Sequence, residues 1–476
     1  MKNFARGLEA WKGWDAVWGL LVLLLPLTSV PIIVKLVHSD VVAAPSALIL
    51  PVILVGWALP ALILGKKFPD NARPLILFFL AALLMTAVSF FRVIPEYKNN
   101  SPLSASLSAI ITLGIGVCFY LAALLRHDSA DRLAFTFRLL TISGAVVCLW
   151  TLAQAFCWYK DQRYPEWMKT VQFAVSIGSL YRQRFVGFTL EPSWLAHQLN
   201  LLYLPWWFAA FVTGYSGFRF RWKFLTVERI CLPVGILVLF LTLSRVGLMA
   251  FLLTVCFCAA VLVHRLIRSR AKSRAAAFGM YLGVFLGIVL CAWIILRLLM
   301  KLDFRMAGLF DIQWQGRSDA VLYLAEKLSL AARFVYWDGG LSVFNAYPLT
   351  GVGLGHAGFY LPTMLNDYAY RLIEVQDLLY HSNTLLNIKS LWIRVLAETG
   401  IIGFAFFFIW YLKHLLGSAV RLNAPLPVSR TAAWMGCFAL IAFIPEGFSL
   451  DTFALPYVWF SAGIAAAGSL LKECNS

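Results

Sequence analysis

Three short motifs place ionisable side chains at the ends of apolar segments. Arg245 belongs to a Ser-Arg pair between two apolar runs. A charged side chain there costs free energy unless it faces a polar cavity. His381, within a Tyr-His-Ser-Asn motif, suits acid–base chemistry or hydrogen bonding. Glu191 opens a further apolar run as part of Glu-Pro-Ser, and Arg182 and Arg184 lie just upstream. These residue types predict a polar site that combines fixed positive charge with a proton acceptor.

Two of these residues also have plainer interpretations. Pro192 is favoured at the start of a helix, so Glu191 could act only through the helix dipole. His381 could be structural, or it could join Glu374 and Asp377, spaced three and four residues apart, in a metal site. Because nearby arginines disfavour a cation, we predict no metal site and keep acid–base and structural roles open for the histidine.

The elements that position these motifs are transmembrane helices. Hydrophobic residues make up 61% of the 476 residues and charged residues only 13%, whereas soluble domains are about 45–50% apolar and about 25% charged. Apolar runs near the length needed to cross a bilayer recur along the whole chain. The sequence therefore predicts a single all-α integral membrane domain over residues 1–476.

We predict about twelve transmembrane spans, and the seventh is short enough to pack inside the bundle. The predicted spans are 17–36, 44–65, 74–95, 104–125, 135–158, 192–213, 230–243, 246–263, 277–300, 396–416, 432–448 and 453–471.

The distribution of basic residues predicts the orientation of these spans. With the N-terminus inside, the inner segments carry most of the lysines and arginines, while the short outer loops after the first and third spans hold only Lys35, Arg92 and Lys98. This asymmetry is the one that positive charge retained in the cytoplasm produces. Both termini are therefore predicted to be cytoplasmic.

Two longer segments fall outside the membrane on the outer side, at 159–191 and 301–395. The larger one follows the ninth span, and its apolar periodicity over 318–332 predicts a helix at the interface. A second stretch, 337–344, leads into a glycine-rich turn at 351–355. Loops of this length are more often functional than idle.

Other features restrict the functional class. The glycines of 353–358 match a dinucleotide motif only formally, because no strand precedes them, and they more plausibly let a tight turn pack against the bundle. The acids Glu191, Glu398, Glu446 and Asp451 fall at the outer ends of spans. Ionisable groups halfway through the membrane, typical of transporters, are nearly absent from the predicted spans, and no internal repeat is evident. The basic residues form no stripe for nucleic acid.

In order, these motifs resemble the O-antigen ligase and polymerase superfamily of bacterial envelope glycan biosynthesis. The resemblance covers about residues 182–410 and rests on Gly-Phe-Thr-Leu-Glu-Pro-Ser at 187–193, Leu-Ser-Arg at 243–245, Arg333 with Trp337 and Phe344, Pro-Leu-Thr-Gly-Val-Gly-Leu-Gly at 348–355, His-Ser-Asn at 381–383 and Leu-Ala-Glu-Thr-Gly-Ile-Ile-Gly at 396–403.

The resemblance implies a fold related to the C-type glycosyltransferases, in the bacterial inner (cytoplasmic) membrane, with a large periplasmic loop between spans nine and ten. It implies that an undecaprenyl-diphosphate-linked glycan is transferred whole to an acceptor sugar at the periplasmic face. The family's critical arginines and histidine fall on Arg245, Arg333 and His381.

Under this resemblance, the diphosphate leaves as an anion and needs fixed positive groups. Four arginines are candidates to bind it: Arg245 and Arg333 first, then Arg184 and Arg371. The leading base for the acceptor hydroxyl is His381, and the second is Glu191. Direct displacement would invert the anomeric carbon. No metal or nucleotide cofactor is required, because the diphosphate is already an activated leaving group.

The Glu-Pro-Ser motif at 191–193 favours a polymerase of O-antigen or exopolysaccharide within this superfamily. The alternative is a ligase that transfers the glycan to lipid A core in lipopolysaccharide biosynthesis, and a non-catalytic transporter is the second alternative. The expected partners are the lipid-linked donor, a glycan or lipid A core acceptor and membrane lipids, with a chain-length regulator left open and no nucleic acid.

Overall fold

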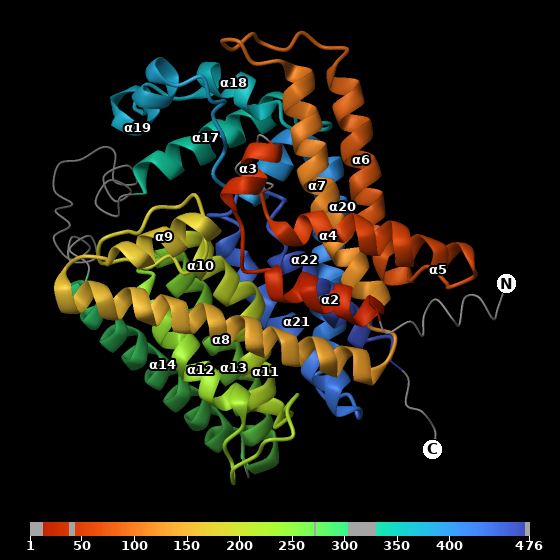
Figure 1. Cartoon of the computed structure of the whole chain (residues 1–476), viewed down its shortest axis with the longest axis vertical. Helices are drawn as coiled ribbons and strands as arrows, with labels where there is room; N and C mark the ends of the chain where they lie inside the picture. Colours follow the sequence, from red (N-terminus) through yellow and green to blue (C-terminus); the bar gives the residue numbers. More distant parts are fainter. Residues whose placement is uncertain (1–12, 38–42, 271–272, 303–329, 472–476) are drawn as a thin grey trace.

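The computed structural model describes residues 13–37, 43–270, 273–302 and 330–471, and these parts of the chain are built from helices (Figure 1). Within them, the only β-type pairing is an isolated antiparallel bridge between Trp222 and Leu225. The predicted all-α class is confirmed for the described residues.

Seven helices among the described residues are long and apolar enough to cross a membrane. They are α6 (Arg73–Ser89, with a preceding 3-10 turn), α7 (Pro102–Arg126), α8 (Ala130–Asp161), α13 (Arg245–Arg270), α20 (Leu391–Val420), α21 (Pro427–Glu446) and the stretch Pro45–Ile63, in which a π turn joins α4 (Pro45–Ile53) to α5 (Leu59–Ile63). The protein is therefore a multi-pass membrane protein.

The other predicted spans are not among these seven, and most of them correspond to shorter or interrupted helices. The first, 17–36, is two helices, α2 (Gly13–Leu24) and α3 (Pro31–Val37). Pro26 follows the end of α2, and proline lacks the N–H that would continue the helix. The remaining ones are α10 (Pro192–Gln198), which continues through a π turn into α11 (Leu204–Thr213), α12 (Val227–Leu241), α14 (Arg274–Leu302) and α22 (Tyr457–Gly468).

The helices α21 and α22 form the centre of the bundle. α21 packs against α11, α13, α20 and α22, while α22 also packs against α7. Small residues allow these close approaches: a Cβ on Gly436 would lie 2.4 Å from Ala465, and a Cβ on Gly463 would lie 2.7 Å from Ala123. Packing through small residues is the usual way in which helices associate within a bilayer.

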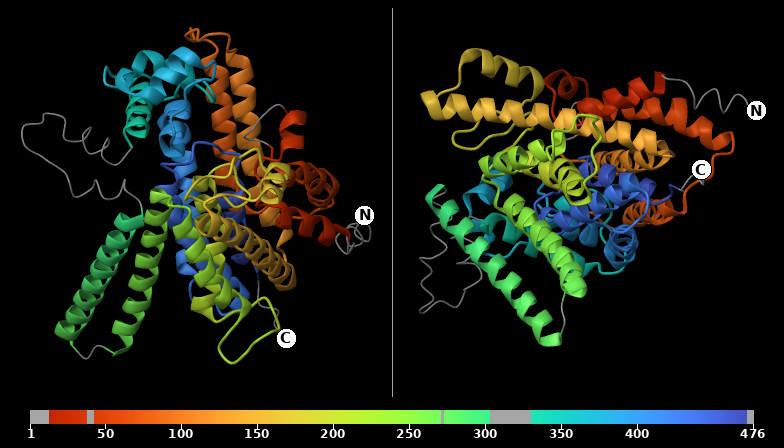
Figure 2. Two further views of the ribbon diagram at one scale, coloured as in Figure 1. Left: turned by 60° about the vertical axis from the view of Figure 1, so that its left-hand side comes forward. Right: turned by 90° about the horizontal axis from the view of Figure 1, so that it is seen from below.

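The hairpin of α13 and α14 lies at the edge of the molecule (Figure 2). The described side chains of α14 include exposed apolar residues such as Phe278 and Phe285. An apolar helix surface without protein cover fits a lipid environment.

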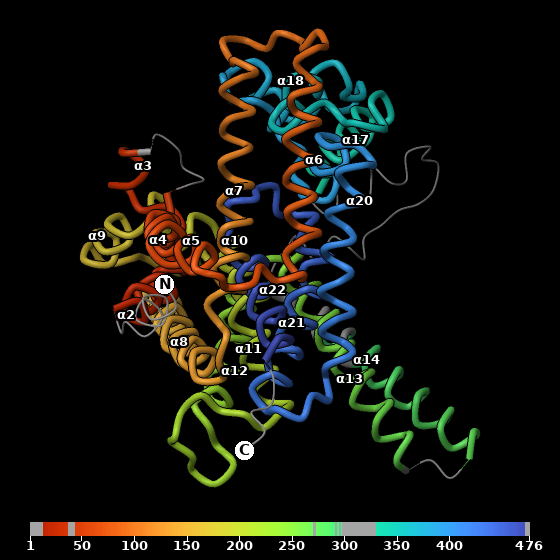
Figure 3. Tube along the Cα trace, turned by 90° about the vertical axis from the view of Figure 1, so that its right-hand side faces the viewer, coloured from red at the N-terminus to blue at the C-terminus, as the bar shows by residue number. Residues whose placement is uncertain are grey.

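A helical cap covers one end of the bundle. It consists of α17 (Ala331–Ala346), α18 (Ala357–Met364), a 3-10 turn (Ala369–Arg371), α19 (Ile373–Gln376) and a π turn (Asp377–His381). Figure 3 shows α6, α7 and α20 side by side, with α17 and α18 beside one end of them. The cap has its own apolar core, which includes Tyr336, Val343 and Phe359.

The cap lies within the predicted outer segment 301–395. The predicted stretch 337–344 lies inside α17, whereas nearly all of the predicted interfacial helix at 318–332 lies outside the described residues. The second predicted outer segment, 159–191, contains the helix α9 (Glu166–Val175).

Some of the predicted outer segments contact one another, and so do some of the predicted inner segments. At the capped end, Arg92 donates a 2.9 Å hydrogen bond to the carbonyl of Gly351. At the opposite end, Lys66 pairs with Asp128 at 2.9 Å, and Lys413 donates to the backbone of the α5–α6 connection.

Candidate functional site

The turn from α12 to α13 holds Arg245 in a fixed position. The side chain of Ser244 caps α13 by accepting a 3.3 Å hydrogen bond from the N–H of Gly247, and the hydroxyl of Thr242 accepts one from the N–H of Ser244 at 3.1 Å. Capping of this kind satisfies N–H groups that a helix start leaves open. Arg245 is thus the first residue of a 26-residue helix, where the helix dipole adds further positive potential.

Arg184 lies against the same turn. Its Nε donates a 3.2 Å hydrogen bond to the carbonyl of Thr242, and the neighbouring N–H of Phe185 donates to the carbonyl of Leu241. Gln154 fixes this segment by pairing with both the N–H and the carbonyl of Gly187. The fold therefore brings two arginines 61 positions apart in sequence to one turn.

Glu191 belongs to the same neighbourhood. It precedes α10, but its side chain does not cap the helix; its Oε2 accepts a 3.0 Å hydrogen bond from Ser193, and the side chain is exposed. Burial raises the pKa of Tyr181; the charge of Glu191 raises it further and Arg184 lowers it, so both charges lie near that hydroxyl. We call Arg184, Glu191 and Arg245 the arginine site.

A buried polar network supports the arginine site from inside the bundle. Asn200 donates 2.7 Å hydrogen bonds to the carbonyl of Gly247 and to Oε1 of Glu446, and Oε2 of Glu446 contacts Nδ1 of His197. Glu446 is 0% exposed and His197 is 3% exposed. The network fixes α10 against the first turn of α13 and the end of α21, because a buried charge is stable only with its partners in place.

Neither His197 nor Asn200 is among the site residues predicted from the sequence. Their spacing of three residues within an apolar run places them on one helix face, and polar side chains at that depth usually mark a site. Glu446 was assigned only to the outer end of its span. Its partner Asn200 lies 246 positions away in sequence, so the contact between them could not be predicted.

Arg333 approaches the same region from the cap. It is half-buried in α17, and its Nη1 donates a 3.3 Å hydrogen bond to the carbonyl of Ser449. The N–H of Ser449 in turn donates to the carbonyl of Glu446. Arg333 is therefore connected through three residues of loop to the network that supports Arg245.

His381 and Arg371 lie elsewhere on the cap, and both side chains are exposed. Nδ1 of His381 is 3.4 Å from Asp377. The adjoining backbone contacts the α6–α7 connection, where Lys98 donates to the carbonyl of Leu378 at 3.1 Å. Glu374, the third residue of the metal set considered from sequence, pairs with Lys389 at 3.0 Å.

The glycine-rich turn packs onto a kink in α20. The N–H groups of Val352 and Gly353 donate to the carbonyls of Ala397 and Glu398 at 3.0 and 2.8 Å. Gly400 has φ 62° and ψ −170° inside the helix, a conformation that side chains rarely adopt. The expectation that these glycines let a tight turn pack against the bundle is confirmed.

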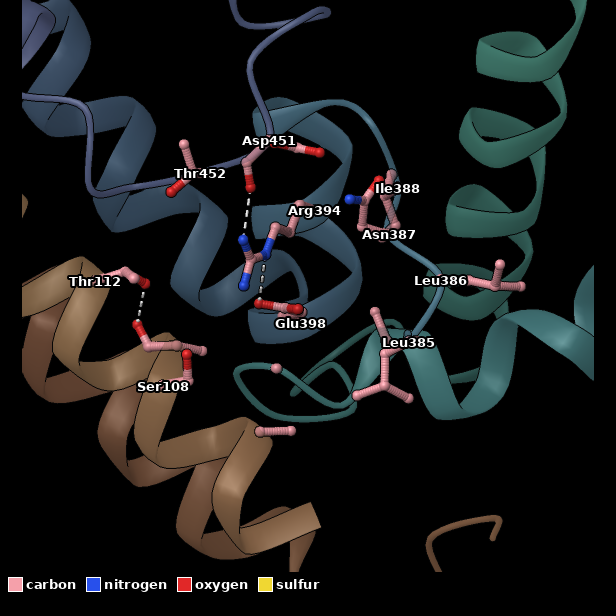
Figure 4. Close-up of a pocket in the computed structure, with 15 residues that line it drawn as sticks. Ser108, Thr112, Leu385, Leu386, Asn387, Ile388, Arg394, Glu398, Asp451 and Thr452 are labelled. Carbon is pink, nitrogen blue, oxygen red and sulfur yellow. Dashed lines mark hydrogen bonds and ion pairs between the residues drawn. The ribbon is translucent and has the colours of Figure 1, made fainter. Parts of the chain in front are cut away.

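A cavity of about 260 Å³ lies between α7, the segment 385–388, α20 and the loop after α21 (Figure 4). Nε of Arg394 donates to Oε2 of Glu398 at 3.1 Å, and Nη1 donates to the carbonyl of Asp451 at 2.5 Å. We call this the Arg394 cavity. Glu398 and Asp451 were predicted at outer span ends, whereas Arg394 was not among the predicted site residues.

The fold and these clusters define a multi-pass helical membrane protein with a polar site at one end of its bundle. Residues 230–408 match the family model described as O-antigen ligase, so this part of the chain is similar to an O-antigen ligase domain. Proteins of this family are glycan-transferring enzymes that act on lipid-linked glycans. No curated protein matches the chain.

The matched region confirms the resemblance found in the sequence motifs. It includes Arg245, Arg333, Arg371, His381 and Arg394. Arg184, Glu191, His197 and Glu446 lie outside it, and the folded chain brings them to the first turn of α13.

Proposed function

We propose that this protein transfers a glycan en bloc from undecaprenyl diphosphate to an acceptor sugar at the periplasmic face of the bacterial inner membrane. The observation that supports this most directly is the arrangement of Arg184 and Arg245 around one capped turn, with Arg333 connected to the same region through Ser449. Arginine donors in fixed positions suit the oxygens of a diphosphate.

The proposed reaction is a displacement at the anomeric carbon. The acceptor hydroxyl oxygen forms the new glycosidic bond, while the bond from the anomeric carbon to the diphosphate oxygen breaks with its electron pair. The arginines stabilise the negative charge that develops on the leaving undecaprenyl diphosphate. Attack opposite the leaving group inverts the anomeric configuration.

A base takes the proton of the acceptor hydroxyl. His381 is our first candidate because its imidazole is exposed on the cap, within the O-antigen ligase domain. Glu191 is the second candidate, since its exposed carboxylate lies beside Arg184. Arg371, which is exposed on the cap, is a secondary contact for the diphosphate in this proposal.

The proposal has two forms, which differ in the acceptor that receives the glycan. We favour a polymerase, which adds one lipid-linked chain to another repeat unit, because of the Glu-Pro-Ser motif at the arginine site. The description of the matched family favours a ligase, which uses lipid A core as acceptor.

The test is reconstitution of the purified protein with lipid-diphosphate repeat units. A ladder of products without any further acceptor supports polymerisation. Product that forms only when lipid A core is added replaces polymerisation with ligation. Movement of the glycan across sealed vesicles without any new glycosidic bond contradicts glycan transfer and favours a transporter.

A further inference from the structure

The Arg394 cavity has a lining that differs in chemistry from the arginine site. It contains hydroxyl, amide and carboxylate groups from four segments: Ser108, Thr112, Asn387, Glu398, Asp451 and Thr452. Figure 4 shows Arg394 and Glu398 between α7 on one side and the segment 385–388 on the other. Groups of these kinds donate to and accept from hydroxyls.

The charge of the cavity disfavours a diphosphate. The guanidinium of Arg394 is engaged by Glu398 and by the backbone of Asp451, while the Asp451 carboxylate adds a second negative charge. The guanidinium of Arg394 is therefore already paired with a carboxylate and a backbone carbonyl. A neutral polyhydroxyl ligand suits such a lining, because each sugar hydroxyl can donate to a carboxylate oxygen and accept from an amide.

Small residues let the walls of the cavity pack closely against one another. Gly355 and Gly358 line it, and a Cβ on either would lie within 2.5 Å of a backbone oxygen, from Ala105 and Leu386 respectively. The turn at 351–355 is bonded to Ala397 and Glu398, so the wall of the cavity is fixed to the helix that carries Arg394. The cavity is thus a built feature of the cap and the bundle.

One loop connects the cavity to the arginine site. The carbonyl of Ser449 accepts from Arg333, and the carbonyl of Asp451, two residues further on, accepts from Arg394. Glu446, just before this loop, belongs to the network beneath Arg245. A ligand in the cavity would therefore lie on the other side of this short loop from Arg333, which we assign to the leaving diphosphate.

We infer that the Arg394 cavity binds a sugar of the acceptor glycan, whereas the arginine site binds the donor diphosphate. This inference rests on the proposed glycan transfer and adds a separate place for the acceptor. Asn387 and Asp451 would recognise hydroxyls directly, and Arg394 would position Glu398 for the same purpose.

The test measures acceptor and donor kinetics separately. The donor is the purified lipid-diphosphate glycan, and the acceptor probe is the same repeat-unit oligosaccharide freed from its diphosphate. Ser108→Trp fills the cavity from α7, and Ser104→Trp, at an exposed position four residues earlier that does not line the cavity, is the matched control. Asn387→Ala removes a single exposed amide.

We expect Asn387→Ala to raise the KM for the oligosaccharide roughly three- to ten-fold, the effect of one lost neutral hydrogen bond. Ser108→Trp should raise it further, while Ser104→Trp should leave it unchanged and all three should keep the donor KM of the wild type. An unchanged acceptor KM in both cavity variants, or a rise in donor KM alone, overturns the inference. If the wild-type protein forms no product with any acceptor, the proposed function itself fails, and that outcome is distinct.

Discussion

Nε of Arg184 lies 3.2 Å from the carbonyl oxygen of Thr242, and this hydrogen bond joins the 159–191 segment to the turn that presents Arg245. The bond occupies one edge of the guanidinium and directs the side chain toward the start of α13. We infer that it sets the separation between two positive groups before a diphosphate arrives, so that little reorganisation is needed during the reaction.

Arg184→Ala should reduce glycan transfer more strongly than Arg182→Ala. Arg184 is half-buried against the α12–α13 turn, whereas Arg182 is exposed two residues earlier and serves as the matched control. The loss of one fixed charge-assisted donor is expected to lower kcat by about ten-fold or more. Initial rates with purified variants provide the measurement, and equal rates for both variants would exclude Arg184 from the site.

His381→Ala should abolish transfer while leaving thermal unfolding unchanged, because the exposed imidazole makes its ion pair at the surface. Glu191→Gln, which keeps the shape but removes the charge, should retain measurable activity. Loss of a general base typically lowers a rate by about 10²- to 10⁴-fold. Wild-type turnover in His381→Ala together with an inactive Glu191→Gln would transfer the role of the base to Glu191.

Glu446→Ala should destabilise the protein by about 3–5 kcal/mol, because it leaves His197 and Asn200 buried without their common partner. Glu166→Ala is the control, since Glu166 forms only an exposed ion pair with Lys169. Unfolding midpoints in detergent compare the two variants. Matching midpoints would show that the buried network does not stabilise the junction of α10, α13 and α21.

Gly400→Ala should prevent stable folding of the cap against α20. A Cβ at this position would lie 2.3 Å from the carbonyl oxygen of Leu349, and φ is 62°. Gly417→Ala in the same helix is the matched control, because a Cβ there meets nothing within 4 Å. Helix propensity predicts that the control gains roughly 0.5–1 kcal/mol. Protease resistance of the cap reports the difference, and equal resistance of the two variants would refute this role of the kink.

The apolar periodicity predicted the class of fold. Prolines account for the clearest difference between the predicted spans and the helices of the structure. Runs of hydrophobic residues identified most helices because each run must satisfy its backbone in lipid. The span expected at 17–36 is interrupted between Leu24 and Pro31, since hydropathy does not register the backbone cost of proline. Of the roughly twelve expected spans, seven correspond to helices among the described residues that are long and apolar enough to cross a membrane.

The candidate site was only partly predictable from the sequence. Arg245 stood out because an apolar turn rarely contains a charge, and the outer position of Glu446 followed from its span. The partnership of Glu446 with His197 did not follow, because it joins residues 249 positions apart whose separate motifs give no sign of contact. The same holds for Arg394 and the loop after α21, which meet only when α20 and α21 pack together.

The most direct test of the account compares Arg245→Ala and Arg333→Ala with Arg163→Ala, a control in the exposed part of the 159–191 segment. Each purified protein is incubated with lipid-diphosphate-linked glycan and acceptor, and both the glycan product and the released undecaprenyl diphosphate are quantified. We predict that each site variant remains folded and loses about 10²- to 10³-fold in rate, while the control matches the wild type. Wild-type rates in both Arg245→Ala and Arg333→Ala would contradict the assignment of these arginines to the leaving diphosphate.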